Sequence, residues 1–279
     1  MKGVWKLNQD KKIVFFDLDG TLMDHNKMIS ESTKQSLTAL RDKGIYTVIC
    51  TGRAPLMFKW LLEELSFDSY VSMNGQHVVL EGEVIYSNPM KLEVIKQLTE
   101  LAHKNGHGLT YSTFESFVSN VDAHPLIQEG TARLKIPYPP VDPEVCLHSD
   151  VNQVQIYSPA KETEKYMELF EDYSFIRWDD NAVDMLPEGA SKAVGIQKML
   201  DHMNIPIENS YAFGDGANDR QMIEMVGIGI AMDNAIPELK EIADFVTASC
   251  SEDGIMKGLI QVGLLEEKDI PLLHGSIKQ

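Results

Sequence analysis

Short apolar runs that end in turn residues alternate with amphipathic stretches at both ends of the chain. Residues 13–16 and 45–50 are largely apolar runs, a pattern typical of strands buried in a parallel sheet. Between them, Ser30 is a suitable N-cap for a helix that ends at Gly44. Pro55 suits the first position of the next helix, which we expect to run to about residue 65. This alternation predicts a parallel sheet with crossover helices.

The pattern changes after residue 70. Asn74-Gly75 lies between the apolar runs 70–72 and 77–80, which predicts a hairpin. From residue 84 to residue 187 the regular alternation is lost, and we expect a separate α+β insert. Its expected helices are 91–104 and 162–170, its expected strands are 151–157, 175–178 and 183–186, and residues 106–150, with five prolines, are expected to be irregular.

The alternation returns after the insert. The expected helices are 191–202, 219–225, 237–242 and 254–264, and the expected strands are 211–213, 228–232 and 245–247. The sequence therefore predicts a doubly wound, Rossmann-like α/β core of residues 1–83 and 188–279, with an α+β cap of residues 84–187 inserted into it. We expect hinges near Glu81–Glu83 and Leu186–Gly189, where glycines lie.

Composition narrows the range of partners. The formal net charge is −17 at pH 7, which argues against nucleic acid and anionic membranes, because both favour a basic surface. The first residues carry charges without an apolar segment, and no run is long enough to span a bilayer. The three cysteines are far apart and are expected to be reduced thiols. We expect a cytoplasmic protein, monomeric or weakly homo-oligomeric.

The first strand ends in Asp17-Leu18-Asp19-Gly20. Carboxylates at the carboxyl end of such a strand lie where open α/β sheets bind ligands. Two close negative charges repel each other, and a cation or a shared proton would relieve that repulsion. Gly20 lets the backbone bend and lets its amide approach an anion. A simple capped turn is the alternative interpretation of these residues.

Two further segments could bind an anion. Thr51-Gly52-Arg53 follows the second strand and offers a hydroxyl, backbone amides and a guanidinium to a phosphate or carboxylate. Alternatively, Thr51 only caps a helix and Arg53 is a surface charge. Lys192 lies in the first turn of an expected helix, where it opposes the helix dipole. That placement hints at a function, although most lysines at such positions are simply solvated.

A second acidic segment, residues 214–219 (Gly-Asp-Gly-Ala-Asn-Asp), follows another short apolar strand. Mg²⁺ prefers oxygen ligands, with few from the protein. Asp17, Asp215 and one backbone carbonyl would supply such a set. A zinc site is not expected, because no histidine or cysteine accompanies these acids.

Together, these motifs resemble those of the haloacid dehalogenase superfamily of phosphatases. The matching pieces are residues 17–21 (DLDGT), 51–53 (TGR), 191–192 (SK) and 214–219 (GDGAND), in the family's order. The insert resembles the cap of the Cof-type subfamily, whose members mostly hydrolyse sugar phosphates and related metabolites. One departure is Ala193, where many relatives have glycine; this changes helix packing without removing the ammonium of Lys192.

The resemblance implies a role for each acid. Asp17 would be the nucleophile, which forms an aspartyl-phosphate, and also a metal ligand. Asp19 would be the general acid and then the general base, and its backbone carbonyl would bind the metal. Asp215 would be the other side-chain ligand of Mg²⁺. Asp219 would orient these ligands or metal-bound water.

The resemblance also implies which residues bind the phosphoryl group. These are Thr51, Lys192 and the amides of residues 18–20, including Leu18 and Gly20. Asn218 could donate its amide to the phosphate or the substrate. Gly52 and Arg53 are further candidates for binding the phosphate or the substrate, and Arg53 and Asn74 could lie at the edge of the pocket. In the cap, His107, His124, Arg133 and Gln155 could face the pocket, although packing or surface positions explain them more simply.

The resemblance therefore implies a Mg²⁺-dependent phosphatase that acts on a small phosphorylated metabolite through an aspartyl-phosphate. A phosphomutase on sugar phosphates would need the same intermediate and remains an alternative. A non-catalytic phosphate-binding module is a third. Receiver-type switches, which also carry a phosphorylated aspartate, lack an acid two residues after it, so Asp19 favours turnover.

Overall fold

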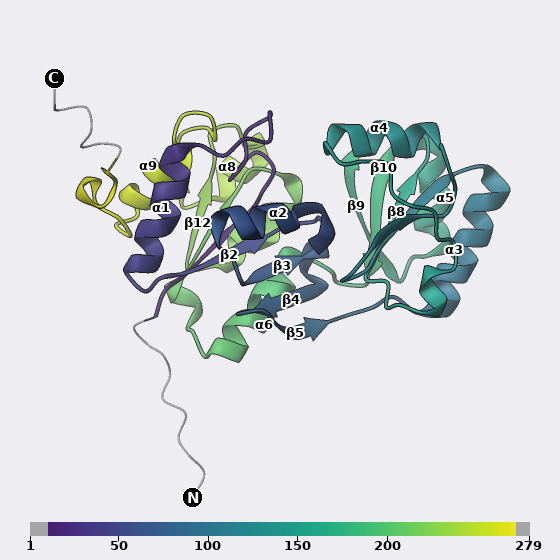
Figure 1. Ribbon diagram of the computed structural model, residues 1–279, viewed down its shortest axis with the longest axis horizontal. Helices are drawn as coiled ribbons and strands as arrows, with labels where there is room; N and C mark the ends of the chain where they lie inside the picture. The colour runs from purple at the N-terminus through teal and green to yellow at the C-terminus, as the bar shows by residue number, and fades with distance from the viewer. Residues whose placement is uncertain (1–10, 272–279) are drawn as a thin grey trace, which may run out of the picture.

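The computed structural model describes residues 11–271; the ends of the predicted core, 1–10 and 272–279, lie outside the described residues. The chain forms two domains, each built on its own sheet (Figure 1). The core sheet has the strand order β13-β12-β11-β1-β2-β3-β4-β5; β4 pairs antiparallel with both β3 and β5, and the other neighbouring strands pair in parallel. Its strands are β1 (Ile13–Phe16), β2 (Tyr46–Cys50), β3 (Tyr70–Ser72), β4 (His77–Leu80), β5 (Glu83–Ser87), β11 (Ser210–Gly214), β12 (Ile228–Ala231) and β13 (Phe245–Val246).

Helices cover both faces of this sheet, because successive residues of its central strands alternate between two apolar layers. Val14 and Phe16 of β1 pack in one layer with α1 (Glu31–Asp42), α2 (Pro55–Leu65) and α9 (Gly254–Gln261). Ile13 and Phe15 pack in the other. That second layer holds α6 (Lys192–Met203), α7 (Arg220–Met225) and α8 (Pro237–Ile242). The predicted doubly wound α/β core is confirmed.

The order of the strands in the core sheet indicates where a ligand is expected to bind. From β1 the chain adds β2 and β3 on one side, and after the insert it adds β11, β12 and β13 on the other. The order therefore reverses between β1 and β11, which are paired in parallel with Phe16 opposite Phe213. In open α/β sheets such a switch point opens a crevice at the carboxyl ends of the strands.

The inserted domain is an antiparallel sheet with helices on it. Its strand order is β7-β6-β8-β10-β9. An apolar layer covers one face, and α4 packs partly over the other (Figure 1). Its elements are α3 (Leu92–Asn105), β6 (Gly108–Ser112), β7 (Phe117–Ser119), α4 (Pro125–Arg133), β8 (Gln153–Tyr157), α5 (Ala160–Leu169), β9 (Tyr173–Asp179) and β10 (Ala182–Pro187).

Two expectations about the insert differ from the structure. Residues 106–150 are not irregular throughout, since they form β6, β7 and α4. The strand β5 belongs to the core sheet through its pairing with β4, so the predicted start of the insert at residue 84 falls inside a core hairpin. Glu81 and Gly82 form the turn of that hairpin, both with positive φ.

The chain crosses between the two domains at residues 88–91 and 188–191 (Figure 1). The inserted domain, residues 88–187, is called the cap.

Gly195 of α6 lies against the turn that joins β3 to β4. A Cβ there would lie 2.4 Å from Val71 Cγ1 and 2.9 Å from Gly75 Cα. Alanine favours a helix over glycine by about 1 kcal/mol, but overpacking costs about 1–3 kcal/mol. We therefore expect Gly195→Ala to lower the free energy of unfolding in urea by roughly 1 kcal/mol. Gln197→Ala, at an exposed position of the same helix, should change it by less than about 0.5 kcal/mol. A more stable Gly195→Ala protein would contradict this packing.

Candidate active site

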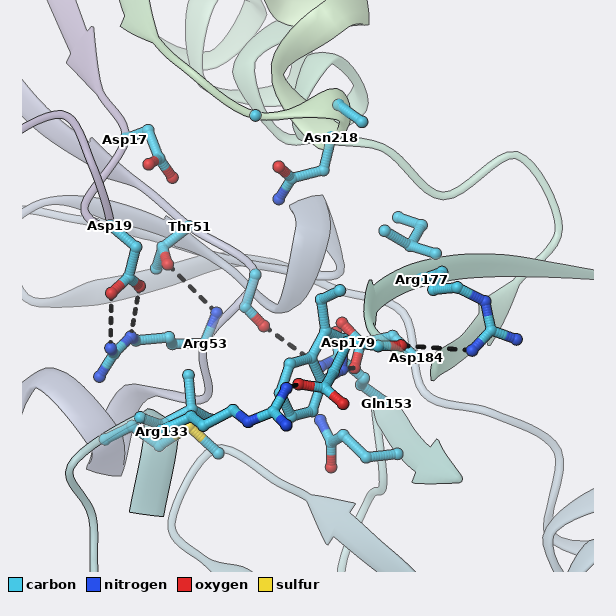
Figure 2. Close-up of a pocket in the computed structure, with 18 of the residues that line it drawn as sticks. Asp17, Asp19, Thr51, Arg53, Arg133, Gln153, Arg177, Asp179, Asp184 and Asn218 are labelled. Atoms are coloured by element: carbon cyan, nitrogen blue, oxygen red, sulfur yellow. Dashed lines mark hydrogen bonds and ion pairs between the residues drawn. The ribbon is translucent and has the colours of Figure 1, made fainter. Parts of the chain in front are cut away.

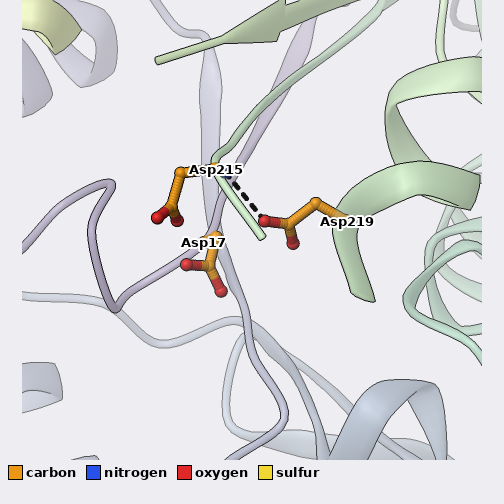
Figure 3. Close-up of side chains that lie close together, drawn as sticks. All are labelled: Asp17, Asp215 and Asp219. Carbon is orange, nitrogen blue, oxygen red and sulfur yellow. Dashed lines mark hydrogen bonds between the residues drawn. The ribbon is translucent and has the colours of Figure 1, made fainter. Parts of the chain in front are cut away.

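Three carboxylates meet where β1 and β11 end. Asp17 follows β1 and continues its ladder, since its backbone N–H donates to Phe213 O at 3.0 Å. Asp215 directly follows the last residue of β11. One carboxylate oxygen each of Asp17, Asp215 and Asp219 lies within 4.8 Å of the others (Figure 3). Parallel pairing of the two strands thus brings together acids that are almost 200 residues apart in the sequence.

A buried lysine balances part of this negative charge. The side chain of Lys192 is fully buried at the start of α6. Its ammonium donates to Asp17 Oδ1 and, at 2.6 Å, to Asp219 Oδ1. The other oxygen of Asp219 accepts the backbone N–H groups of Asp215 and Gly216, both at 2.9 Å. Asp219 therefore fixes both the lysine and the loop that carries Asp215.

The remaining charge is unfavourable without a further cation. Burial raises the pKa of Asp17 well above its ordinary value; Asp219 and Asp215 add to the increase, and Lys192 opposes it. Burial, with Asp219 nearby, raises the pKa of Asp215 to about 7. Burial alone would lower the pKa of Lys192, but Asp17 and Asp219 outweigh it and raise that pKa. Crowded carboxylate oxygens of this kind fit a hard divalent ion such as Mg²⁺.

Gly20 allows the backbone to approach this cluster. Its φ is +86°, and a Cβ there would lie 2.2 Å from Asp215 Oδ2. Only glycine combines that conformation with that contact. The Gly20 amide donates to Met23 O at 2.9 Å, so in this structure it does not point at a ligand, which differs from our expectation. The Leu18 side chain is buried in the core, and only its backbone is available to the site.

Asp19 lies beside the cluster, and two cations hold its carboxylate. Arg53 donates from Nε to Asp19 Oδ2 at 2.6 Å and from a terminal nitrogen to Oδ1 at 2.7 Å (Figure 2). Lys27 also donates to Oδ1. Burial would raise the pKa of Asp19, but Arg53 and Lys27 outweigh it and lower that pKa. Asp19 is therefore ionised in this arrangement.

These residues line one side of a cleft of about 470 Å³ between the core and the cap. Asp17, Asp19, Thr51 and Asn218 lie on the core side, and Gln153 and Asp184 on the cap side (Figure 2). Thr51 accepts the Arg53 backbone N–H at 3.2 Å. Among the residues predicted for the site, Gly52, Arg53 and Asp215 also line the cleft.

Asn74 joins the two sides. Its backbone is left-handed, with φ 50° and ψ 42°. Its side-chain oxygen accepts from Asn218 of the core at 3.2 Å, and its nitrogen donates to Asp184 at 3.1 Å and Gln153 at 3.3 Å of the cap. Gln153 in turn donates to Gly52 O at 3.1 Å. The loops expected to bind phosphate are thus hydrogen-bonded to the cap.

The cap candidates divide into two groups. Arg133 and Gln155 line the cleft. His107 instead bonds to Tyr166 and Glu162, and His124 to Gly106 O, so both serve the cap's own packing. Sequence reasoning missed Lys27, Gln153 and Asp184, which carry no motif. It also missed Asn234, which donates to Gly20 O at 2.8 Å.

Comparison with known proteins gives consistent matches. A model of the haloacid dehalogenase-like hydrolase family matches residues 14–259. The "Putative phosphatase YkrA" of Bacillus subtilis (strain 168) is 42% identical over 92% of this chain and 100% of that protein. A hypothetical protein from Geobacillus kaustophilus HTA426 superposes with a TM-score of 0.87 at 44% identity, over 91% of this chain and 100% of that one. The subclass IIB sugar phosphatase BT4131 does so with a TM-score of 0.81 at 28% identity, over 91% and 100%.

Within residues 11–271, none of the helices combines the length and the apolar character needed to cross a membrane.

The interdomain role of Asn74 can be tested without straining the backbone. Asn74→Gly keeps the left-handed conformation but removes the bonds to Asn218, Gln153 and Asp184. We expect faster amide hydrogen exchange in β8 and in the crossings at 88–91 and 188–191, with β1 and β11 unchanged. Asn204→Gly is a matched control, since Asn204 is left-handed at the end of α6. Equal exchange in both variants would contradict the bridging role.

The buried carboxyl of Asp184 should make the free energy of unfolding depend on pH. Burial raises its pKa from 3.8 to about 7, although Trp178 and Asn74 donate to it. A raised folded-state pKa stabilises the protein below the unfolded-state pKa, and that stability is lost as pH rises through about 7.

Relative to Asp184→Asn, the wild type should therefore lose roughly 2–3 kcal/mol of unfolding free energy between pH 5 and pH 8. Urea unfolding at both pH values measures this difference. Asp122→Asn, at an exposed position, should show none. A difference that does not change with pH would mean that Asp184 titrates normally.

Proposed function

We propose that this chain, which belongs to the haloacid dehalogenase-like hydrolase family, is a Mg²⁺-dependent phosphatase that transfers the phosphoryl group of a small metabolite to Asp17 and then hydrolyses it. Phosphatase activity on small phosphorylated metabolites follows from the family and its relatives. The metal and the covalent intermediate are our proposal.

The observation that supports it most is the contact of Asp17 with the buried Lys192, beside Asp215, where Asp17 and Asp215 line the cleft between core and cap. A carboxylate attacking a phosphate dianion meets strong repulsion. Fixed positive charge in a partly buried site reduces that repulsion more effectively than water does. The ammonium of Lys192 is already held against the Asp17 carboxylate, so only a small rearrangement would bring it to the phosphoryl oxygens.

Asp17 and Asp215 would hold the Mg²⁺ ion, with one backbone carbonyl, that of Asp19, as the expected third protein ligand. When bound, the ion would neutralise charge on the phosphate and on the two carboxylates. Asp219 would keep Asp215 and Lys192 in position through the bonds described above.

In the proposed reaction, an Asp17 oxygen bonds to phosphorus as the ester oxygen leaves. Asp19 gives its proton to that leaving oxygen and afterwards takes a proton from the water that releases phosphate. The paired Arg53 and Lys27 oppose protonation of Asp19 in this structure. We propose that the substrate phosphate draws these cations away, so that Asp19 becomes protonated only when substrate is bound.

The cleft suits a leaving group of limited size. Its volume of about 470 Å³ is at the small end of ligand pockets. The cap closes it on the side away from Asp17 (Figure 2). A structural relative is a sugar phosphatase, and we propose sugar phosphates and related monoesters as the substrates here.

Phosphate release from a panel of sugar phosphates and p-nitrophenyl phosphate tests the reaction. We expect release with Mg²⁺, none with a chelator, and a loss on the order of a thousandfold or more in Asp17→Asn, which removes the nucleophile. Asp122→Asn is the matched control, because it removes an exposed acid of the cap. Isomerised sugar phosphate without release would show a mutase instead.

Metal binding has a readout that is independent of turnover. Mg²⁺ should raise the melting temperature of the wild type, because an ion that binds only the folded state stabilises it. Asp215→Asn should lose most of this shift, and Asp122→Asn should keep it. A shift that survives in Asp215→Asn would place the ion elsewhere.

A further inference from the structure

The cap sheet presents a buried polar face to the cleft. On β8, Gln153, Gln155 and Tyr157 alternate with Val154 and Ile156, which pack in the apolar layer of the cap. All three polar side chains line the cleft and are almost fully buried. Polar groups in such a position are costly unless they are hydrogen-bonded, so their partners indicate their purpose.

Of the three polar side chains on this face, Tyr157 is the one whose polar group lacks a hydrogen-bond partner within residues 11–271. Tyr157 is 1% exposed, and its hydroxyl has no hydrogen-bond partner among the described residues. The Thr110 hydroxyl lies close enough to oppose the rise in the pKa of Tyr157. Its proton is donated to Gln155 Oε1 at 2.6 Å, and its oxygen does not form a hydrogen bond of acceptable geometry with the Tyr157 hydroxyl. Leaving a buried hydroxyl unpaired destabilises the fold, whereas phenylalanine would fill the same space. An unpaired hydroxyl at the wall of a cleft therefore indicates that a bound ligand supplies its hydrogen-bond partner.

The fold makes room for this side chain. Gly130 lies inside α4, where glycine is unfavourable. A Cβ at Gly130 would lie 2.7 Å from Tyr157 Cε1 and 3.2 Å from Trp178 Cη2. The two aromatic rings pack edge to face, with centroids 6.1 Å apart. Gly130 lowers the helix propensity of α4, but its lack of a side chain allows Tyr157 and Trp178 to pack at the wall of the cleft.

Asp184 of β10 lines the same cleft as Tyr157. It faces Gln155 across the β8–β10 ladder, and it raises the pKa of Tyr157 in addition to the larger effect of burial. Its carboxyl accepts from Trp178 Nε1 at 2.9 Å and from Asn74 at 3.1 Å. Each carboxylate oxygen can accept more than one hydrogen bond, so Asp184 has capacity left for a donor in the cleft.

The charges of the cap wall do not favour an anion at this place. Arg133 is paired with Asp179. Arg177 donates to the backbone oxygens of Asp179 and Asp180 at 3.2 and 3.0 Å. Both cations thus have acceptors within the cap, whereas the Asp184 carboxyl accepts from the neutral donors Trp178 and Asn74 and forms no ion pair within the described residues. Above about pH 7, where the Asp184 carboxyl is ionised, a second phosphate next to it would be repelled in this buried setting.

We propose that Tyr157 and Asp184 determine the specificity of the site: they hydrogen-bond hydroxyl groups of the leaving group and exclude leaving groups that carry a second phosphate. We call Tyr157 and Asp184 the leaving-group subsite. This assignment rests on the proposed phosphatase function, which places the phosphate near Lys192 and the leaving group at the cap. Tyr157 would bind one hydroxyl, and Asp184 would accept from another.

The first test measures kcat/KM for glucose 6-phosphate, ribose 5-phosphate, fructose 1,6-bisphosphate and p-nitrophenyl phosphate. In Tyr157→Phe we expect the preference for the better sugar monophosphate over p-nitrophenyl phosphate to fall about tenfold, the effect of one lost hydrogen bond to a buried group. In Asp184→Asn at pH 8, where the wild-type carboxyl is ionised, we expect the preference for that monophosphate over the bisphosphate to fall by a similar factor.

Tyr111→Phe is the matched control. Tyr111 is also fully buried in the cap, but it lies in the apolar layer and its hydroxyl bonds to Thr99 at 2.8 Å. This variant should melt at a lower temperature with its substrate preferences intact. Tyr157→Phe should melt at the same or a higher temperature, because it removes an unpaired hydroxyl. Preferences that stay unchanged in both Tyr157→Phe and Asp184→Asn would overturn the proposal.

A second measurement separates this proposal from the proposed function. In Asp17→Asn, which cannot turn over, the same four esters are compared by the shift in melting temperature that each produces. We expect the largest shift with a sugar monophosphate, reduced when Tyr157→Phe is added. That pattern without phosphate release by the wild type would support the subsite and contradict the phosphatase. Equal shifts with all four esters would overturn the subsite, whatever the wild type hydrolyses.

Discussion

The crowding of three carboxylates around one buried ammonium is the constraint on which the rest of this site depends. Asp17, Asp215 and Asp219 are brought together by the parallel pairing of β1 with β11, and Lys192 cannot neutralise all three. A cation together with a phosphate dianion would complete the charge balance. The fold thus holds the acids in an arrangement whose repulsion a metal ion and an anionic substrate would relieve.

The two walls of the cleft supply different interactions. The core side carries fixed positive charge, because Arg53 lines the cleft and Lys192 lies buried against Asp17, and this side suits a phosphate group. The cap wall offers a hydroxyl and a carboxyl from a polar sheet face and suits an uncharged leaving group. Asn74 links the walls by bonding to both. Through it, the position of the cap relative to the phosphate-binding loops is fixed by hydrogen bonds rather than by apolar packing alone.

Much of the core site could be predicted from sequence, because residues that follow parallel strands meet at one sheet edge. Asp17, Thr51 and Asp215 each follow such a strand, so local pattern was sufficient. Asp184 is different, since its neighbourhood depends on how the cap folds back on the core. The start of the cap was misplaced because the Glu81-Gly82 turn of a core hairpin resembles a hinge. Helix α4 was missed among the prolines of residues 106–150.

Trapping the covalent intermediate tests the central claim most directly. The protein is mixed with Mg²⁺ and a sugar phosphate that it hydrolyses, quenched, and treated with borohydride, which reduces an acyl phosphate to an alcohol. Our account predicts homoserine at position 17 by peptide mass spectrometry, dependent on substrate and absent with phosphate-free sugar. Reduction at Asp19 or Asp215 instead, or none during active turnover, would contradict the assignment of Asp17 as the nucleophile.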